Sequence, residues 1–324
     1  MQKNLAYDPM KVAVIIPVYR AAGSIGRCVR SALSQELPDG FSLEVIVSDD
    51  CSGDDTLDAA RAADDGSGRL IIVEGVVNTG PSGARNLALR QTNARWFTPL
   101  DSDDYYKPGR LKALLETALE GSWDLMADDL EFSFEDAPDV ITRRLWSDVD
   151  FGHKILSLDF FVLQNTSKAA YRRELGYLKP LIDREHFAVG ADVYSQDMRF
   201  QEDYELYTRM MANGARFCLT DPKGYVAVHR QGSLSYSQKA IDFERVVTVD
   251  KLLLARDTLP PLERRAVQAH LREAEAEGCW WRAIEGVREH KPLKFLSAFF
   301  ISPSASASLV VRLVKWVFNS GRAK

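Results

Sequence analysis

Several features of other protein classes are missing from this 324-residue sequence. No apolar run approaches the roughly 18 residues that a membrane-spanning helix needs, and the N-terminus has no signal-peptide pattern. The four cysteines form no CxxC pair, so we expect free thiols in a reducing compartment. The net charge is -5 and no basic stripe runs beside aromatic residues, which argues against nucleic-acid binding. These absences predict a cytoplasmic protein.

Acidic residues are missing from the C-terminus. Every charged residue after Glu289 is basic: Lys291, Lys294, Arg312, Lys315, Arg322 and Lys324. Residues 309–318 place Trp and Phe beside basic residues at helical spacing, which is typical of a helix that lies on an anionic membrane surface. The alternative is a pair of helices docked on the catalytic domain.

The first part of the chain alternates buried strands with helices. The expected strands cover 11–19, 43–50, 69–75 and 94–100, and the expected helices cover 24–35, 53–64, 80–92 and 107–121. Such alternation predicts an α/β fold with a mainly parallel sheet and helices on both faces. In these sheets ligands bind beyond the carboxyl ends of the strands.

Distinctive residues follow three of the expected strands. Pro17 and Tyr19 end the first strand, and Asp49 and Asp50 end the second. The fourth strand runs into a cluster of three carboxylates, Asp101, Asp103 and Asp104. Like charges this close repel one another unless a cation lies among them. We therefore expect one rim of the sheet to carry a site.

The acids suit two tasks. Asp103 and Asp104 can hold Mg²⁺ or Mn²⁺ together with substrate phosphates, although a DxD pattern alone is also found in solvated turns. Asp50 can accept a hydrogen bond from a ring N–H such as uracil N3, although acids after a strand also cap helices.

Two later segments carry further candidates. Glu202 and Asp203 begin an amphipathic helix, where acids also serve simply to balance the helix dipole. His229 ends an alternating strand, "YVAVH", and can be a metal or phosphate ligand or a structural residue.

The ordered motifs resemble the inverting, GT-A-fold glycosyltransferases of family 2. These motifs are "VIIPVY", "VSDDCSGDDT", "NTGPSGARNLAL", "LDSDD" and "QEDYELYTRMMANG", and the resemblance covers roughly residues 11–238. Among family members, the chain is most similar in character to bacterial enzymes of succinoglycan and other exopolysaccharide synthesis. Arg20 departs from the pattern, because the family usually has Asn there.

The resemblance implies roles for individual residues. The implied nucleotide-sugar set is Pro17, Tyr19, Asp49, Asp50, Arg85 and Asp101. Within it Asp50 would hold the uracil, Arg85 would face the nucleotide or its phosphates, and Asp101 would lie near the ribose or donor sugar. The implied metal set is Asp103, Asp104 and His229. Asp203, at an ordinary pKa, would be the catalytic base, supported by Glu202.

The resemblance also implies an activity and a division of the chain. Residues 1–240 would form the GT-A catalytic domain, with about 11–127 binding the nucleotide-sugar and about 128–240 carrying the acceptor side and the base. Residues 241–324 would form a helical extension with a basic amphipathic tail. A hexosyltransferase using Mn²⁺ or Mg²⁺ would move a sugar, with inversion to a β-linkage, from a UDP-sugar to a lipid-linked glycan at the inner face of the cytoplasmic membrane. The alternatives are a non-catalytic nucleotide-sugar-binding module and a sugar-phosphate nucleotidylyltransferase.

Overall fold

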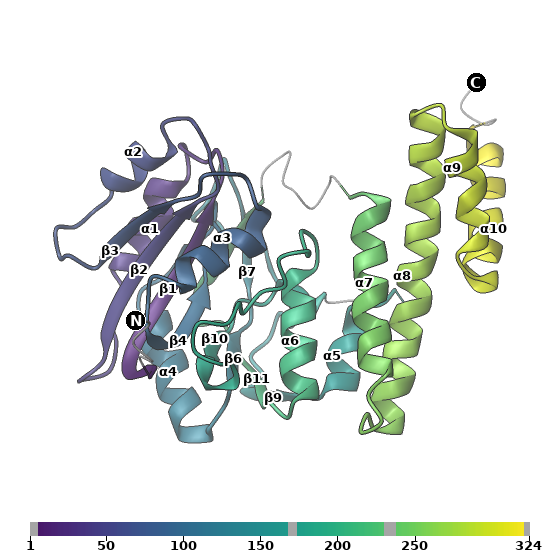
Figure 1. The fold of residues 1–324 in the computed structure, drawn as a ribbon. Helices are drawn as coiled ribbons and strands as arrows, with labels where there is room; N and C mark the ends of the chain where they lie inside the picture. Colours follow the sequence, from purple (N-terminus) through teal and green to yellow (C-terminus); the bar gives the residue numbers. More distant parts are fainter. Residues whose placement is uncertain (1–5, 168–173, 230–237, 321–324) are drawn as a thin grey trace. The chain divides into compact units, whose positions relative to one another are not determined.

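The computed structural model describes residues 6–167, 174–229 and 238–320, with side chains up to position 315 (Figure 1). The chain divides into two compact units. The first comprises Met1–Ser157 with Leu175–Gln231, and the second comprises Leu158–Glu174 with Gly232–Lys324. The predicted boundary near residue 240 therefore differs from this division, because the helical unit also includes residues 158–174 and its second stretch begins at residue 232.

The first unit is built on an eight-stranded mixed sheet in the order β3-β2-β1-β4-β10-β6-β11-β9. Its strands are β1 (Asp8–Val18), β2 (Ser42–Asp49), β3 (Leu70–Glu74), β4 (Ala94–Pro99), β6 (Leu125–Asp128), β9 (His153–Leu156), β10 (Leu181–Asp183) and β11 (Phe217–Thr220). The first four strands pair in parallel, as predicted. The short β10 lies antiparallel between β4 and β6, which no sequence pattern indicated.

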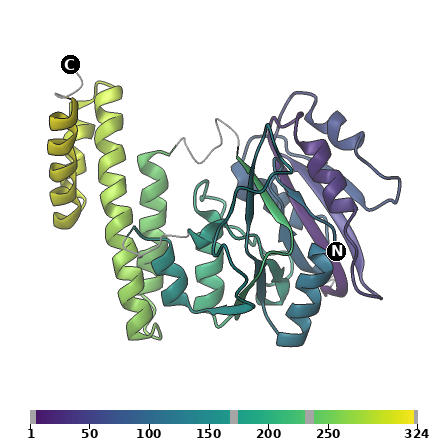
Figure 2. The ribbon, with the colours of Figure 1, turned by 180° about the vertical axis from the view of Figure 1, so that it is seen from behind.

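Helices cover both faces of this sheet, as expected. They are α1 (Ile25–Leu33), α2 (Thr56–Arg61), α3 (Gly80–Leu89), α4 (Arg110–Gly121) and α6 (Glu202–Ala212), with the short 3-10 turns η1 (Leu175–Tyr177) and η2 (Arg184–His186). Figures 1 and 2 show α1 and α2 on one side of the first strands and α3 on the other. The side chains of Val12, Val14, Ile15 and Ile16 on β1 are completely buried, because the strand is covered on both faces.

A second, four-stranded sheet has the order β5-β12-β7-β8. Its strands are β5 (Tyr105–Tyr106), β7 (Glu131–Phe134), β8 (Arg143–Arg144) and β12 (Tyr225–His229). Because β5 directly follows the acidic cluster and pairs with β12, this sheet brings the end of β12 to that cluster.

The second unit is helical. It contains α5 (Leu158–Gln164), α7 (Ala240–Leu254), α8 (Pro261–Arg288), α9 (Pro292–Ser297), the 3-10 turn η4 (Ala298–Phe300) and α10 (Pro303–Ser320). One face of α10 docks on this unit, because Ala305 and Leu309 are buried against Cys279 and Ala283 of α8. Arg312 also pairs with Glu277. This face of α10 therefore packs on the helical unit itself, whereas the alternative that the sequence left open placed it on the catalytic domain.

Many of the exposed side chains of the tail are apolar. Leu293, Leu296, Phe300, Val310, Val311 and Val314 are each at least 48% exposed. No helix in the described part of the chain combines the length and apolar character needed to cross a bilayer.

Candidate active site

The carboxyl ends of β1, β2 and β4 meet at one edge of the large sheet. In the strand register Val18 pairs with Asp49, and Ile15 pairs with Pro99. The segments that follow these three strands are therefore neighbours, as the alternation of strands and helices predicted.

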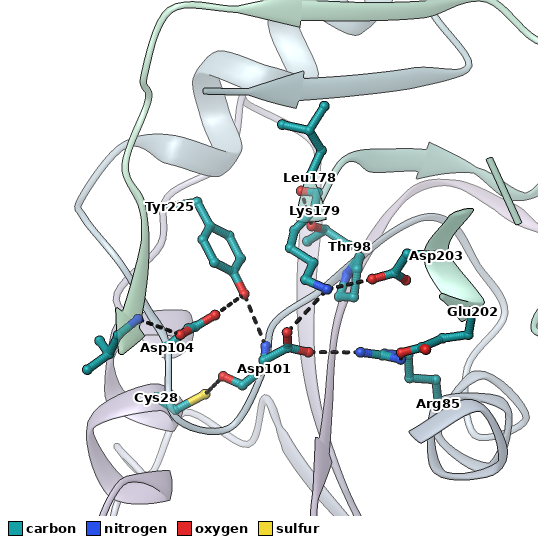
Figure 3. A network of polar contacts seen from close by, with 12 residues as sticks. Cys28, Arg85, Thr98, Asp101, Asp104, Leu178, Lys179, Glu202, Asp203 and Tyr225 are labelled. Carbon is teal, nitrogen blue, oxygen red and sulfur yellow. Dashed lines mark hydrogen bonds and ion pairs between the residues drawn. The ribbon is translucent and has the colours of Figure 1, made fainter. Parts of the chain in front are cut away.

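Asp101 lies at the centre of a charge network at this edge (Figure 3). Its Oδ1 is 2.8 Å from Nη2 of Arg85, and its Oδ2 is 3.2 Å from Nζ of Lys179. Burial acts to raise the pKa of Asp101, but Lys179 and Arg85 bring that pKa down to about 2. Asp101 is therefore a carboxylate throughout the neutral range, and its side chain is 33% exposed.

Arg85 is held more deeply than the sequence predicted. Its side chain is only 3% exposed, and its second guanidinium nitrogen lies 2.7 Å from Oε1 of Glu202. The guanidinium also packs over the ring of Tyr194, 5.3 Å from the centroid. Arg85 thus joins Asp101 to Glu202. In this arrangement both ends of its guanidinium are paired with carboxylates, although the sequence predicted that this guanidinium would face the nucleotide or its phosphates.

Asp203 is brought to the same network by the first turn of α6. The chain enters this helix through Gln201, whose φ of 55° lies in the left-handed region that costs a non-glycine residue about 1–3 kcal/mol. Glu202 and Asp203 follow at the positive end of the helix dipole. Oδ2 of Asp203 lies 2.5 Å from Nζ of Lys179.

The other oxygen of Asp203 is different. Oδ1 is buried and has no hydrogen-bond partner among the described residues. Burial raises the pKa of Asp203, and the charges of Lys179 and Arg85 oppose that rise without cancelling it. The expectation of an ordinary pKa is therefore wrong. A raised pKa suits a residue that must accept a proton near neutral pH.

Asp104 is turned inward, which its predicted role as a metal ligand did not anticipate. Its Oδ1 accepts a 2.8 Å hydrogen bond from the backbone N–H of Val228, and its Oδ2 accepts a 2.7 Å bond from the phenol of Tyr225. Burial, together with the charges of Asp103 and Asp101, raises the pKa of Asp104 well above its usual value. This geometry fits a residue that fastens β12 to the acidic loop.

The predicted metal trio does not form a ready-made site. Within the described ranges, no three His, Cys, Asp or Glu side chains come together in a way that could hold a metal ion. Asp103 is half-buried, whereas His229 is exposed and stacks on Phe132, with ring centroids 5.1 Å apart. Magnesium and manganese ions commonly take one or two carboxylates and complete their shell with phosphates and water. The residues therefore fit a metal that is held by Asp103 and completed by the substrate.

Asp49 and Asp50 both organise the backbone of their own edge. Asp49 accepts hydrogen bonds from the backbone and hydroxyl of Ser52. Asp50 accepts three hydrogen bonds, from the backbone N–H and hydroxyl of Thr79 and from the backbone N–H of Gly80. Asp50 is only 5% exposed, and these bonds tie the end of β2 to the start of α3.

Tyr19 is the predicted nucleotide contact with the most open surface. Its side chain is 43% exposed, whereas Pro17, two residues earlier, is half-buried. Arg20 follows with a φ of 50°, and its guanidinium lies 5.1 Å from the centre of the Tyr19 ring. This φ lies in the left-handed region, which Asn adopts more readily than Arg.

Lys179 is the site residue that the sequence did not reveal. It stands in "YLKPLID", just before a three-residue strand, and neither of its ion-pair partners lies near it in the sequence. A basic residue in a mostly apolar, proline-containing stretch was the only available signal.

Comparison with known proteins identifies the family. The family model described as glycosyl transferase family 2 matches residues 13–171. The succinoglycan biosynthesis protein ExoU of Rhizobium meliloti is 40% identical over 270 residues, which cover 82% of this chain and 76% of ExoU.

A shorter match and a solved structure extend the comparison. The UDP-Glc:alpha-D-GlcNAc-diphosphoundecaprenol beta-1,3-glucosyltransferase WfaP of Escherichia coli is 39% identical over 95 residues, or 29% of this chain and 36% of WfaP. The crystal structure of S. aureus TarS 1–349 with UDP-GlcNAc superposes with a TM-score of 0.59 at 17% identity, covering 89% of this chain and 90% of that one, and shares the fold. The length and identity of the match to ExoU, together with the family model, show that this chain is a glycosyltransferase and belongs to glycosyl transferase family 2.

Proposed function

We propose that the protein is an inverting enzyme that transfers a sugar from a UDP-sugar to a hydroxyl of a lipid-linked oligosaccharide in exopolysaccharide or other surface-glycan synthesis. The observation that carries this proposal is the carboxylate of Asp203. One oxygen is fixed by Lys179, and the other is buried without a partner among the described residues. A buried acceptor atom without a donor costs free energy unless a ligand supplies one.

The acceptor hydroxyl is the donor that we assign to Asp203 Oδ1. A neutral hydroxyl is a weak nucleophile, so a carboxylate must take its proton as the oxygen attacks the anomeric carbon. The bond from that carbon to the diphosphate breaks on the opposite face, and the nucleoside diphosphate leaves. One displacement inverts the configuration, so an α-linked donor gives a β-linked product.

The donor is assigned to the edge formed by β1, β2 and β4. Tyr19 offers an exposed ring for the base, and Asp101 offers a carboxylate that is ionised at neutral pH. We accordingly assign about 11–127 to the donor side and about 128–240 to the acceptor side. A UDP donor is supported by the name of WfaP and by the UDP-GlcNAc complex of TarS.

The proposal includes a divalent cation bound by Asp103. When bound, it would neutralise negative charge on the leaving diphosphate. Asp103 would hold it together with the phosphates, and His229, near the end of β12, is a further candidate.

We assign the protein to the inner face of the cytoplasmic membrane, because a lipid-linked acceptor would be held there. WfaP is named for a diphosphoundecaprenol acceptor. In this chain the tail exposes Leu293, Phe300, Val311 and Val314, and apolar side chains with basic neighbours suit an anionic bilayer surface. Lys315 is exposed, whereas Arg312 is paired with α8, so the apolar contacts carry more of this assignment than the charges.

A donor and acceptor panel tests the proposal. The purified protein is incubated with UDP-sugars, Mn²⁺ and a polyprenyl-diphosphate-linked glycan, and UDP release is measured with and without the acceptor. We expect acceptor-dependent release and a β-configured product by NMR. An α-configured product would overturn inversion, and equal release without acceptor would overturn transfer to a glycan.

A further inference from the structure

Lys179 occupies the middle of the candidate active site. Its ammonium lies 2.5 Å from Asp203 Oδ2 and 3.2 Å from Asp101 Oδ2, and its side chain is 8% exposed. Asp101 belongs to the loop after β4, whereas Asp203 belongs to α6. The lysine is therefore the direct link between the loop assigned to the donor and the helix that carries the assigned base (Figure 3).

The backbone on either side of this lysine is fixed from three directions. Arg110 donates a 2.6 Å hydrogen bond to the carbonyl of Lys179, and Thr98 donates a longer one of 3.5 Å. Tyr207 of α6 donates a 2.8 Å bond to the carbonyl of Leu178. Arg110 is itself fully buried and paired with Asp128. The ammonium is thus placed by a rigid support, as a group that must hold another in position requires.

The charges around Lys179 do not balance. Three carboxylates, Asp101, Glu202 and Asp203, face two cations, Arg85 and Lys179, so one negative charge is left over among these residues. A buried ion-pair cluster that serves only stability is expected to be neutral and fully hydrogen-bonded. Here the one fully buried carboxylate oxygen without a hydrogen-bond partner among the described residues belongs to Asp203.

We propose that Lys179 is a positioning residue that clamps Oδ2 of Asp203 to Oδ2 of Asp101, so that Oδ1 of Asp203 is aimed at the acceptor hydroxyl. This inference rests on the proposed function, since it assumes that Asp203 is the base. Removal of the ammonium would leave Asp203 free to rotate. It would also remove the positive charge that opposes the effect of burial on the pKa of Asp203.

Other groups also face Asp203 and enter the test. Arg85, Glu202 and Asp101 surround it, together with the buried phenols of Tyr194 and Tyr207. All of them stay in place when only Lys179 is replaced. A change in the acidic limb of the pH–rate profile can therefore be assigned to the lysine.

The test compares Lys179→Met, Lys179→Gln and Lys179→Arg with the parent. The amide of Gln still donates a hydrogen bond to a buried carboxylate but carries no charge. We expect Lys179→Met and Lys179→Gln to lower kcat about a hundredfold, within the range that a general base supplies. We also expect the pH at which activity falls on acidification to move upward. Lys179→Arg should recover at least tenfold of the lost kcat.

Two controls distinguish the role of Asp203 as the base from the role of Lys179 as its positioning residue. Lys107→Met removes a more exposed ion-paired lysine, 2.7 Å from Glu131, and should change neither kcat nor the pH profile. Asp203→Asn is measured in parallel. If Asp203→Asn retains activity, the assignment of Asp203 as the base is wrong. If Asp203→Asn is inactive but Lys179→Met and Lys179→Gln keep the parental kcat and pH profile, only the positioning role of Lys179 is wrong. If neither neutral variant folds, Lys179 is a structural ion pair and the proposal is overturned.

Discussion

The phenol of Tyr225 donates a 2.7 Å hydrogen bond to the carboxylate of Asp104, although the two residues lie 121 positions apart in the chain. The same phenol oxygen accepts a hydrogen bond from the backbone N–H of Asp101, 3.3 Å away. Tyr225 therefore fastens the acidic loop at two points and fixes where its remaining carboxylates lie.

This arrangement predicts different defects for two neighbouring acids. Asp104→Asn should lower the free energy of unfolding by about 1–3 kcal/mol, because one buried donor loses its acceptor. Asp103→Asn should lose the response to Mn²⁺. Denaturant unfolding measures the first effect, and Mn²⁺ binding by electron paramagnetic resonance with UDP present measures the second. An Asp104→Asn protein as stable as the parent that no longer binds Mn²⁺ would restore Asp104 as a metal ligand.

Asp203→Asn should bind the UDP-sugar normally and lose transfer by at least a hundredfold. The amide keeps the shape of the side chain but cannot accept the acceptor proton. Calorimetry with UDP and turnover assays measure the two properties. Asp192→Asn, which alters an exposed acid paired with Arg90, is the matched control. Turnover of Asp203→Asn within about threefold of the parent, less than 1 kcal/mol of barrier, would sink the assignment.

The pH dependence of the parent enzyme follows from the raised pKa of Asp203. A base works only when it is deprotonated, so kcat should fall as the pH is lowered through this pKa, above the range of an ordinary Asp. Rates measured between about pH 4 and 9, with unfolding monitored at each pH, test this expectation. A rate that stays constant down to about pH 4.5 in folded protein would contradict it.

Arg110→Met should be strongly destabilising. The guanidinium and its partner Asp128 are both fully buried, 2.8 Å apart, so the substitution leaves an uncompensated carboxylate in the core. We expect a loss of about 3–5 kcal/mol in the free energy of unfolding. Arg61→Met, which removes a half-exposed pair with Glu74, should cost less than about 1 kcal/mol. Similar costs for the two variants would contradict the expected difference.

Membrane contact can be tested without removing the tail. The double variant Leu293→Ser/Phe300→Ser alters two side chains that are at least 80% exposed, so folding should be unaffected. In flotation with vesicles containing anionic lipid, the parent should float and the double variant should bind several-fold less. Leu262→Ser, at a 67% exposed position at the start of α8, is the control. If none of the three proteins floats, the tail has only its docked role.

The sequence predicted the parts of this molecule that depend on local pattern. Buried apolar runs located β1, β2 and β4, and the alternation with helices implied that their carboxyl ends would meet. It did not reveal β10, because three residues are too few for a pattern, or Lys179, whose partners come from α6 and from the loop after β4. Nor could it show that Asp104 turns inward while Asp103 stays half-buried, since that choice depends on Tyr225, a residue that only tertiary packing brings near.

The position of β10 has a consequence for how the chain folds. β4 and β6 are synthesised well before residues 181–183, and until those residues arrive each of the two strands presents an edge without its native neighbour. Lys179 stands two residues before β10, so closure of the sheet and delivery of the lysine to Asp101 happen together. A nascent or truncated chain that ends before β10 exposes two unpaired strand edges and an incomplete charge cluster. We expect this form to be the most prone to aggregate.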